Sequence, residues 1–117
     1  MASLAQLLDD VVVNRFALQG PTTRLGRHPD NDIQIDDLSV SGHHARLIQS
    51  PNRYLPDVTD YFVEDLGSTN GTFVNDQRIE GRHLLGSNDV LRLAWNRFKL
   101  IDAGAERLEQ TAHLLNL

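Results

Sequence analysis

The sequence predicts an all-β fold, a sandwich or closed barrel of short strands, with a short helix at its C-terminal end. Residues of high β-propensity recur in short runs, and several of these runs alternate apolar with polar side chains. Turn-forming Gly, Pro, Asn and Asp separate the runs at short intervals. No helical periodicity interrupts them before residue 102. Together these three observations favour a sandwich or barrel over alternating βα units.

The strands can be placed in order between the turn signals. Asp9-Asp10 supplies turn chemistry between the first two runs, and Gly20-Pro21 ends the second. Loops are expected at 29–32 and, as the longest irregular stretch, at 49–60. The predicted strands are Ser3–Leu8, Val11–Leu18, Thr22–Leu25, Ile33–Ile35, Ala45–Gln49, Tyr61–Leu66, Thr72–Val74, Arg78–Ile79, Val90–Ala94 and Arg97–Ile101.

The pattern changes after Asp102. Good helix formers fill residues 105–115, where Leu108, Ala112 and Leu115 are spaced i, i+4 and i+7, and Asp102 can cap such a helix. We therefore expect one β domain over residues 1–102 and a helical tail, or the start of a linker, over residues 103–117. A tail helix would pack on its own domain, whereas a linker or coiled coil would lead to something beyond this chain.

Composition argues against several classes of function. The 117 residues suit one hydrophobic core. A net charge of −5 argues against non-specific nucleic-acid binding, which needs a concentrated basic surface. No apolar stretch is long enough for a membrane span, and the N-terminus does not have the pattern of a signal peptide. Cysteine is absent, which excludes thiolate chemistry and fits a cytoplasmic location.

The first polar motif is Gly26-Arg27, at the end of a predicted strand. Glycine allows a backbone conformation or a close approach that a β-carbon would block. Arg27 would project into loop space, and a guanidinium presents a planar set of donors that suits a phosphate dianion. Taken alone, this arginine is more simply a solvated surface residue.

The second motif is Ser41-Gly42-His43-His44. A serine hydroxyl can donate to an anion, and backbone N–H groups beside Gly42 can form a small anion-binding concavity. We expect no metal site, because adjacent histidines on a strand point to opposite faces and no neighbouring residue completes a ligand set. The segment lacks the Gly-x-Ser-x-Gly pattern of a serine nucleophile. His44 is more simply a residue hydrogen-bonded within the loops.

The third motif runs from Asp65 to Asn75 and contains Ser68-Thr69-Asn70-Gly71-Thr72. Asn-Gly between two strand-like runs indicates a tight turn, because both residues tolerate positive φ. Three hydrogen-bonding side chains in a row are more than a turn requires. An asparagine amide both donates and accepts, so it can pair with the main chain of an extended peptide.

The order and spacing of these motifs resemble the forkhead-associated (FHA) domain family. The resemblance rests on Gly26-Arg27, Ser41-x-x-His44, Ser68-Thr69-Asn70-Gly71-Thr72 and Asn75, with Asn31-Asp32-Ile33 and Asp65-Leu66-Gly67 also similar. It extends from about Leu25 to Ile101. It implies a sandwich of about eleven short strands with the binding loops at one end. The family contains readers of phosphorylated motifs.

The resemblance also implies a role for each matched residue. Arg27 and Ser41 would contact the phosphate, with help from Thr69 and from the backbone N–H of Gly42. Asn70 would hold the peptide main chain beside the phosphothreonine. The remaining matched positions would shape and brace the loops, namely Gly26, His44, Gly71 and Asn75.

Two positions depart from the family pattern. Gly42 follows the serine where the family often has arginine, lysine or asparagine, so only its backbone can assist the phosphate. Asp76 follows Asn75 where the family often has glycine, which alters a turn.

The predicted function is phosphothreonine-dependent binding of partner proteins, without catalysis and without a cofactor. The alternative is a phosphate-independent interaction or self-association module on the same fold. A third hypothesis, an enzyme, would use the acidic cluster Asp30, Asp32, Asp36 and Asp37. No base, nucleophile and oxyanion donor converge in the sequence, so these residues are expected to form a solvated loop.

Overall fold

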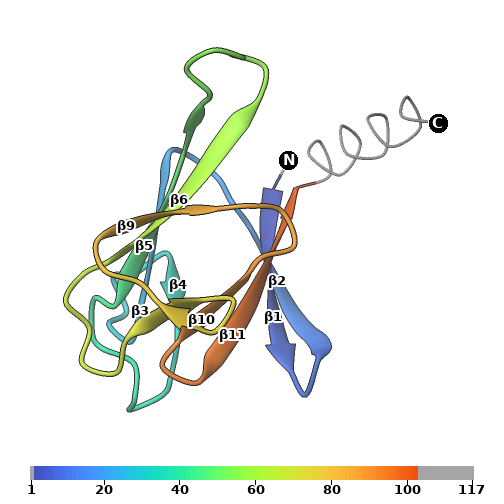
Figure 1. Cartoon of the computed structure of the whole chain (residues 1–117). Coiled ribbons are helices and arrows are strands. Elements are labelled where there is room, and N and C mark those ends of the chain that lie inside the picture. The colour runs from blue at the N-terminus through green and yellow to red at the C-terminus, as the bar shows by residue number, and fades with distance from the viewer. Residues whose placement is uncertain (1, 103–117) are drawn as a thin grey trace.

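A computed structural model describes residues 2–102, which form two β-sheets (Figure 1). The all-β prediction is confirmed. The tail helix expected within residues 103–117 lies outside the described residues. The strands are β1 (Ala2–Leu8), β2 (Val11–Ala17), β3 (Thr22–Gly26), β4 (Ile33–Gln34), β5 (Ala45–Pro51), β6 (Thr59–Asp65), β7 (Thr72–Val74), β8 (Gln77–Arg78), β9 (Arg82–Leu85), β10 (Val90–Leu93) and β11 (Asn96–Asp102).

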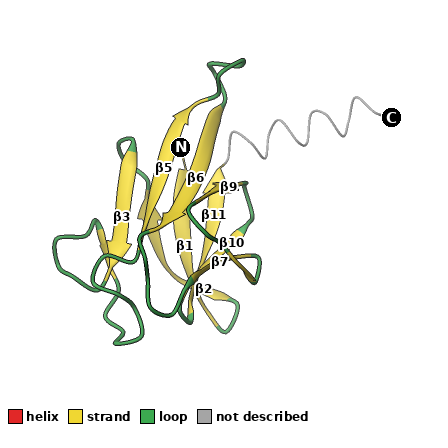
Figure 2. Cartoon of the chain, turned by 60° about the vertical axis from the view of Figure 1, so that its left-hand side comes forward, coloured by secondary structure: helices red, strands yellow, loops and turns green. Residues whose placement is uncertain are grey.

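The two sheets contain six and five strands. The first has the order β2-β1-β11-β10-β7-β8 and the second the order β4-β3-β5-β6-β9. The pairing of β3 with β4 is parallel, and the other strand pairs are antiparallel. Figure 2 shows the described residues as strands joined by loops, with no helix. Residues 2–102 accordingly contain no helix that could cross a membrane.

The hydrophobic core follows the alternation of the strands. In β11, Phe98 and Leu100 are fully buried while Lys99 between them is partly exposed, and Leu91 in β10 is also fully buried. The second sheet contributes Leu47 and Val63, from β5 and β6. Burial of each such side chain contributes about 1.5–3 kcal/mol. The alternation of buried and exposed side chains along each strand therefore fixes which face of the sheet packs against the core.

The structure differs from the predicted strands at β9, which the sequence analysis missed. Arg82, His83 and Leu84 are exposed, and only Leu85 is buried. The strand lies at the edge of its sheet and pairs with β6 alone, so its sequence lacks an alternating apolar face. Strand β8 ends before Ile79, which is nonetheless buried in the core.

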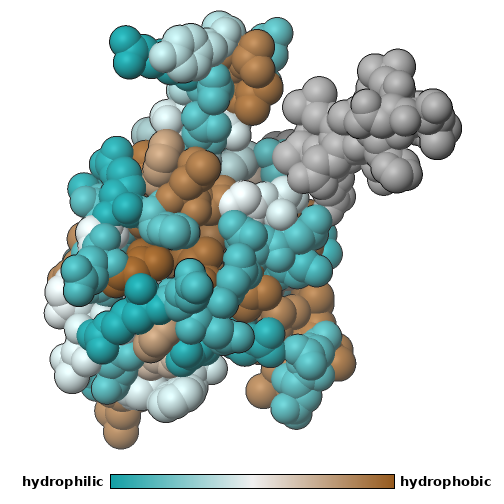
Figure 3. Space-filling model, viewed as in Figure 1, coloured by the Kyte–Doolittle hydropathy of each residue, from teal (hydrophilic) through white to brown (hydrophobic). Residues whose placement is uncertain are grey.

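The hairpin β1–β2 exposes apolar residues. Strand β2 is the edge of the six-stranded sheet, and Val11, Val12 and Val13 are exposed. Apolar surface is visible at the lower right of Figure 3, where this hairpin lies in the same view. These valines thus favour the strand conformation through their β-propensity, although they are not buried in the core.

Three loops meet at one end of the sandwich: β3–β4 (27–32), β4–β5 (35–44) and β6–β7 (66–71). They lie at the lower end of Figure 1, whereas the β5–β6 loop projects at the top. Backbone hydrogen bonds join the first two, from the Arg27 N–H to the Ser41 carbonyl (3.0 Å) and from the His28 N–H to the Gly42 carbonyl (3.1 Å). The fold thus brings together residues that the sequence separates widely.

Candidate functional site

Arg27 begins the β3–β4 loop directly after Gly26, the last residue of β3. Its side chain is exposed. Within residues 2–102 its guanidinium has no hydrogen-bond or ion-pair partner, although its backbone is bonded on both sides. A guanidinium that no carboxylate neutralises is available to an external anion.

Gly26 is required by a close approach of two loops. A Cβ at this position would overlap the carbonyl oxygen of Gly42, and it would lie 2.8 Å from Nδ2 of Asn31. The Asn31 amide donates to the carbonyls of Gly42 (2.7 Å) and His28 (2.8 Å), so it fastens the β4–β5 loop to the β3–β4 loop. Asn31 was noted as similar to the family but was not assigned to the site. Its role depends on a contact across eleven residues of sequence.

Ser41 joins the β4–β5 loop to the β6–β7 loop. Its hydroxyl oxygen accepts a hydrogen bond from the backbone N–H of Thr69, at 3.1 Å. The hydroxyl has one proton to donate, and it has no acceptor within residues 2–102. The backbone N–H of Gly42 also has no partner in the described part of the chain. Both donors are therefore free for an external acceptor.

Gly42 has room for a side chain. A Cβ built there has only the Cβ of His28 in its neighbourhood, at 4.0 Å. The absence of a basic side chain at this position is thus a feature of the sequence and not a steric requirement of the fold.

His44 is fully buried and braces two loops. Its Nδ1 accepts the backbone N–H of Ser41 (3.1 Å), so the ring proton is on Nε2, which donates to the carbonyl of Gly71 (2.8 Å). Burial lowers the pKa of His44 below its ordinary value of 6.5, although the Gly71 carbonyl and the Asp65 carboxylate act in the opposite direction. The neutral imidazole is the form that fits both partners.

Asp65 organises the β6–β7 loop at the end of β6. Its carboxylate accepts from the hydroxyls of Ser68 (2.5 Å) and Thr72 (2.7 Å), and from the backbone N–H groups of Gly67 and Ser68. Burial alone would raise the pKa of Asp65, but these hydrogen bonds outweigh it, so the pKa lies below its ordinary value of 3.8. The spacing Asp-x-x-Ser is the sequence signal for this role, because a carboxylate can accept from residues two and three positions on.

Thr69 and Asn70 are exposed at the tip of this loop. Nδ2 of Asn70 donates to the carbonyl of Ser39, at 2.7 Å, which orients the amide against the β4–β5 loop. Its Oδ1 has no partner within residues 2–102. Gly71 has a φ of 90°, which favours glycine, and a Cβ there would crowd the ring of Phe73.

Asn75 lies apart from these loops, in the turn between β7 and β8. Its side chain accepts the Val90 N–H (2.9 Å) and donates to Asp89 (3.1 Å), so it ties this turn to the start of β10. Asn75 and Asp76 both have positive φ, 49° and 67°. The turn therefore forms without the glycine that is frequent at the second position.

Three of the four acidic residues between 30 and 37 have separate partners, and the Asp36 carboxylate has none within residues 2–102. Asp32 accepts the backbone N–H of Arg24 (2.8 Å), and Asp37 accepts from Ser39 and Asn96. Asp30 contacts two histidines instead. These separate partners give no shared site for acid–base chemistry.

Known proteins resemble this chain both in sequence and in structure. The FHA domain model matches residues 23–94. The glycogen accumulation regulator GarA of Mycolicibacterium smegmatis is 39% identical over 77 residues, which cover 66% of this chain and 44% of that protein. The transcriptional regulatory protein EmbR of Mycobacterium tuberculosis is 36% identical over 99 residues, covering 83% of this chain and 24% of that protein. The chain thus spans less than half the length of these two relatives.

The crystal structure of the FHA domain of CT664 from Chlamydia trachomatis has a TM-score of 0.73 and 32% sequence identity, over 86% of this chain and 96% of that one. The structure of EmbR from M. tuberculosis in complex with a low affinity phosphopeptide has a TM-score of 0.72, also with 32% identity, over 86% of this chain and 24% of that one. By the family match and by this likeness in sequence and fold, the chain belongs to the FHA domain family.

Proposed function

We propose that this chain binds phosphothreonine-containing segments of partner proteins, without catalysis, through Arg27, Ser41, Gly42, Thr69 and Asn70. The observation that carries the proposal is the exposed, unpaired guanidinium of Arg27 beside a loop whose free donors are those of Ser41 and Gly42. The phosphopeptide bound to the related EmbR supports the same class of ligand. A cytoplasmic location is part of the proposal.

The phosphate would be held by donors from two loops. Arg27 would supply a charge-assisted, two-point contact, and the Ser41 hydroxyl and Gly42 N–H would donate to the remaining oxygens. Each charge-assisted hydrogen bond contributes about 1.5–3 kcal/mol. Two or three of them, with contacts to the peptide, account for micromolar affinity, which corresponds to about −8 kcal/mol.

The peptide main chain would be held by Asn70. Its amide is already oriented by the carbonyl of Ser39, and Oδ1 is available to a peptide N–H. Thr69 is exposed beside it and contributes a further hydroxyl. A preference for phosphothreonine over phosphoserine would come from burial of the extra methyl, which contributes about 0.8 kcal/mol.

A phosphate-independent interaction module is the second candidate function. The specific observation in its favour is Gly42, which leaves Arg27 as the cation of the proposed phosphate contact. Under this alternative, the loops would bind a partner through neutral hydrogen bonds, and loss of the Arg27 charge would have little effect.

The test is binding of a degenerate phosphothreonine peptide library, followed by titration of a selected peptide in phosphothreonine, phosphoserine and unphosphorylated forms. Arg27→Ala should weaken phosphothreonine binding about tenfold or more. The matched control is Arg53→Ala, because Arg53 is an exposed arginine in the β5–β6 loop at the other end of the sandwich. Equal binding of the three peptide forms, or equal affinity of the two variants, would contradict the proposal.

A further inference from the structure

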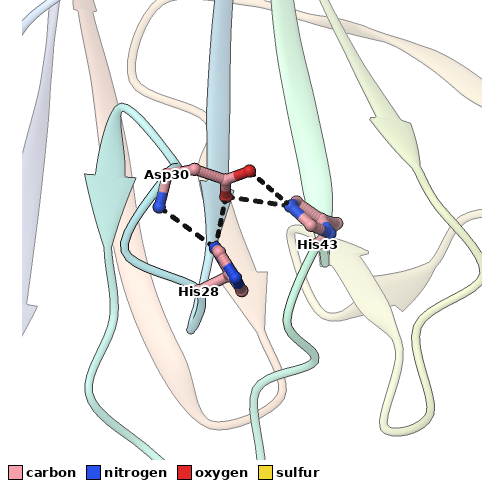
Figure 4. Close-up of side chains that lie close together, drawn as sticks. All are labelled: His28, Asp30 and His43. Carbon is pink, nitrogen blue, oxygen red and sulfur yellow. Dashed lines mark hydrogen bonds and ion pairs between the residues drawn. The ribbon is translucent and has the colours of Figure 1, made fainter.

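Three exposed side chains from two loops meet beside the candidate site. His28 and Asp30 belong to the β3–β4 loop and His43 to the β4–β5 loop (Figure 4). Nδ1 of His28 lies 2.7 Å from Oδ1 of Asp30, and Nε2 of His43 lies 2.9 Å from the same oxygen. Both imidazoles therefore direct a nitrogen at one carboxylate oxygen.

The three groups converge closely enough to share an ion. One nitrogen of each ring and a carboxylate oxygen all lie within 4.8 Å of one another. Two ligand atoms at about 2.0–2.1 Å from a tetrahedral Zn²⁺ are separated by about 3.3 Å. The two nitrogen–oxygen separations of 2.7 and 2.9 Å would open by a few tenths of an ångström, and the two ring nitrogens, which lie within 4.8 Å of each other, would come to about 3.3 Å by rotation of the exposed side chains.

The backbone already holds the two loops in this arrangement. The N–H of His28 donates to the carbonyl of Gly42 (3.1 Å), and the Asn31 side chain donates to the carbonyls of both His28 and Gly42. The rings of His28 and His43 are stacked, with centroids 5.3 Å apart and planes inclined by 26°. An ion would consequently meet ligands whose relative positions are set by the fold.

Hydrogen bonding alone is the simpler role for such a cluster, and the two roles use the same atoms. In the hydrogen-bonded form, Nε2 of His43 faces both carboxylate oxygens of Asp30, and Nδ1 of His28 faces both the carboxylate and the backbone N–H of Asp30 (3.2 Å), so which nitrogen of each ring carries the proton depends on the tautomer. In a metal-bound form, each of these two nitrogens gives its lone pair to the ion, each imidazole carries its proton on the other nitrogen, and Nδ1 of His28 no longer accepts from the Asp30 N–H. The sequence analysis predicted no metal site because it paired His43 with its neighbour His44. The ring of His44 faces Ser41 and Gly71 and not Asp30.

We propose that His28, Asp30 and His43 form a binding site for a divalent first-row transition-metal ion such as Zn²⁺. Two imidazole nitrogens and one carboxylate oxygen suit Zn²⁺ and its transition-metal neighbours, whereas Mg²⁺ and Ca²⁺ prefer ligand sets of oxygen alone. Three protein ligands leave a fourth position open to water or to an external group. This site does not depend on the proposed phosphopeptide function.

The test is calorimetric titration of the full chain with ZnCl₂ after treatment with a chelator, with MgCl₂ and CaCl₂ as comparison ions. We expect saturable binding of one Zn²⁺ per chain and none of Mg²⁺ or Ca²⁺ at the same concentrations. His28→Gln, Asp30→Asn and His43→Gln should each weaken Zn²⁺ binding about tenfold or more. His83→Gln is the matched control, because His83 is an exposed histidine in β9, outside these loops.

Two results would overturn the proposal: no saturable Zn²⁺ binding by the unmodified chain, or the same affinity in all four variants. Thermal melting of each variant shows whether it is folded. A second measurement uses only the unmodified chain, in which Zn²⁺ should shift or broaden the imidazole NMR signals of His28 and His43 but not that of His83. Equal perturbation of His83 would count against the site.

Discussion

The hydroxyl oxygen of Ser41 accepts a hydrogen bond from the backbone N–H of Thr69, across 28 residues of sequence. The bond joins the β4–β5 loop to the β6–β7 loop and leaves the Ser41 proton directed to no acceptor within residues 2–102. One side chain thus positions the Thr69–Asn70 loop and remains able to donate to a ligand. The structural role of Ser41 thus coincides with the ligand-binding role proposed for it.

Ser41→Ala is therefore expected to reduce both stability and binding. Loss of the bond to Thr69 should cost about 0.5–1.5 kcal/mol in the free energy of unfolding. Loss of the phosphate donor should weaken phosphothreonine peptide binding about tenfold or more. Ser39→Ala is the control in the same loop, because the Ser39 hydroxyl bonds to Asp37 while its carbonyl, which holds Asn70, is retained. Peptide titration should show a loss of affinity in Ser41→Ala alone. Urea unfolding measures the accompanying loss of stability.

Gly26→Ala tests the close approach of the two loops that form the proposed phosphate site. The added methyl would overlap the carbonyl oxygen of Gly42, which is backbone and cannot turn away as a flexible side chain does. We expect a loss of about 1–3 kcal/mol in the free energy of unfolding, together with weaker peptide binding. In Gly86→Ala the added methyl meets only the Asp89 side chain at ordinary contact distance, so stability should change by less than about 1 kcal/mol. Equal stability of the two variants, measured by urea unfolding, would show that the loops separate easily.

The sequence was sufficient for the parts of the fold that alternation and turns encode. Strands β5, β6, β10 and β11 have apolar residues on one face and could be located, whereas β9 could not, because three of its four side chains are exposed at a sheet edge. Arg27, Ser41 and Asn70 were singled out by order and spacing. The structure brings their loops together through backbone and side-chain bonds.

Contacts between loops were beyond the sequence because each depends on residues far apart in the chain. Asn31 meets Gly42 only once β3 and β5 have paired, and His43 meets Asp30 in the same way. The role of Asp65 was easier to predict from the sequence, because its partners Ser68 and Thr72 follow within seven residues. Turn chemistry explains such local bonds, while long-range ones follow only from the assembled sandwich.

Asp65 should make the β6–β7 loop sensitive to acid. Its pKa in the folded chain lies below 3.8, so its contribution to stability is fully present above that value and is lost as the pH falls through the folded pKa. Asp65→Asn replaces one of the two carboxylate oxygens by an amide NH₂, which cannot accept from the groups that donate to Asp65. Four such groups surround the side chain, so the free energy of unfolding should fall by about 1–3 kcal/mol at pH 7. The variant should also lose less stability than the unmodified chain as the pH falls below 3.8 and through the folded pKa of Asp65.

The measurement for Asp65 is urea unfolding at a series of pH values. Asp36→Asn is the control, because Asp36 is an exposed aspartate whose carboxylate has no partner within residues 2–102. The free energy of unfolding of Asp36→Asn should vary with pH in parallel with that of the unmodified chain. If the Asp65→Asn curve is parallel as well, the carboxylate does not stabilise the loop through its ionised form.

Gly42→Lys tests whether a phosphate sits against the β4–β5 loop. The position has open space for a side chain and lies directly after Ser41, so a lysine there would add a cation near the free donors. A charge-assisted bond contributes about 1.5–3 kcal/mol, which predicts phosphothreonine peptide binding about tenfold tighter or more. Gly42→Gln adds a neutral side chain of similar length and separates the effect of charge from that of packing. Fluorescence titration should show the gain only for lysine and only for the phosphorylated peptide, and the gain should shrink as salt is raised. An affinity that the lysine leaves unchanged would place the phosphate elsewhere and favour the phosphate-independent alternative.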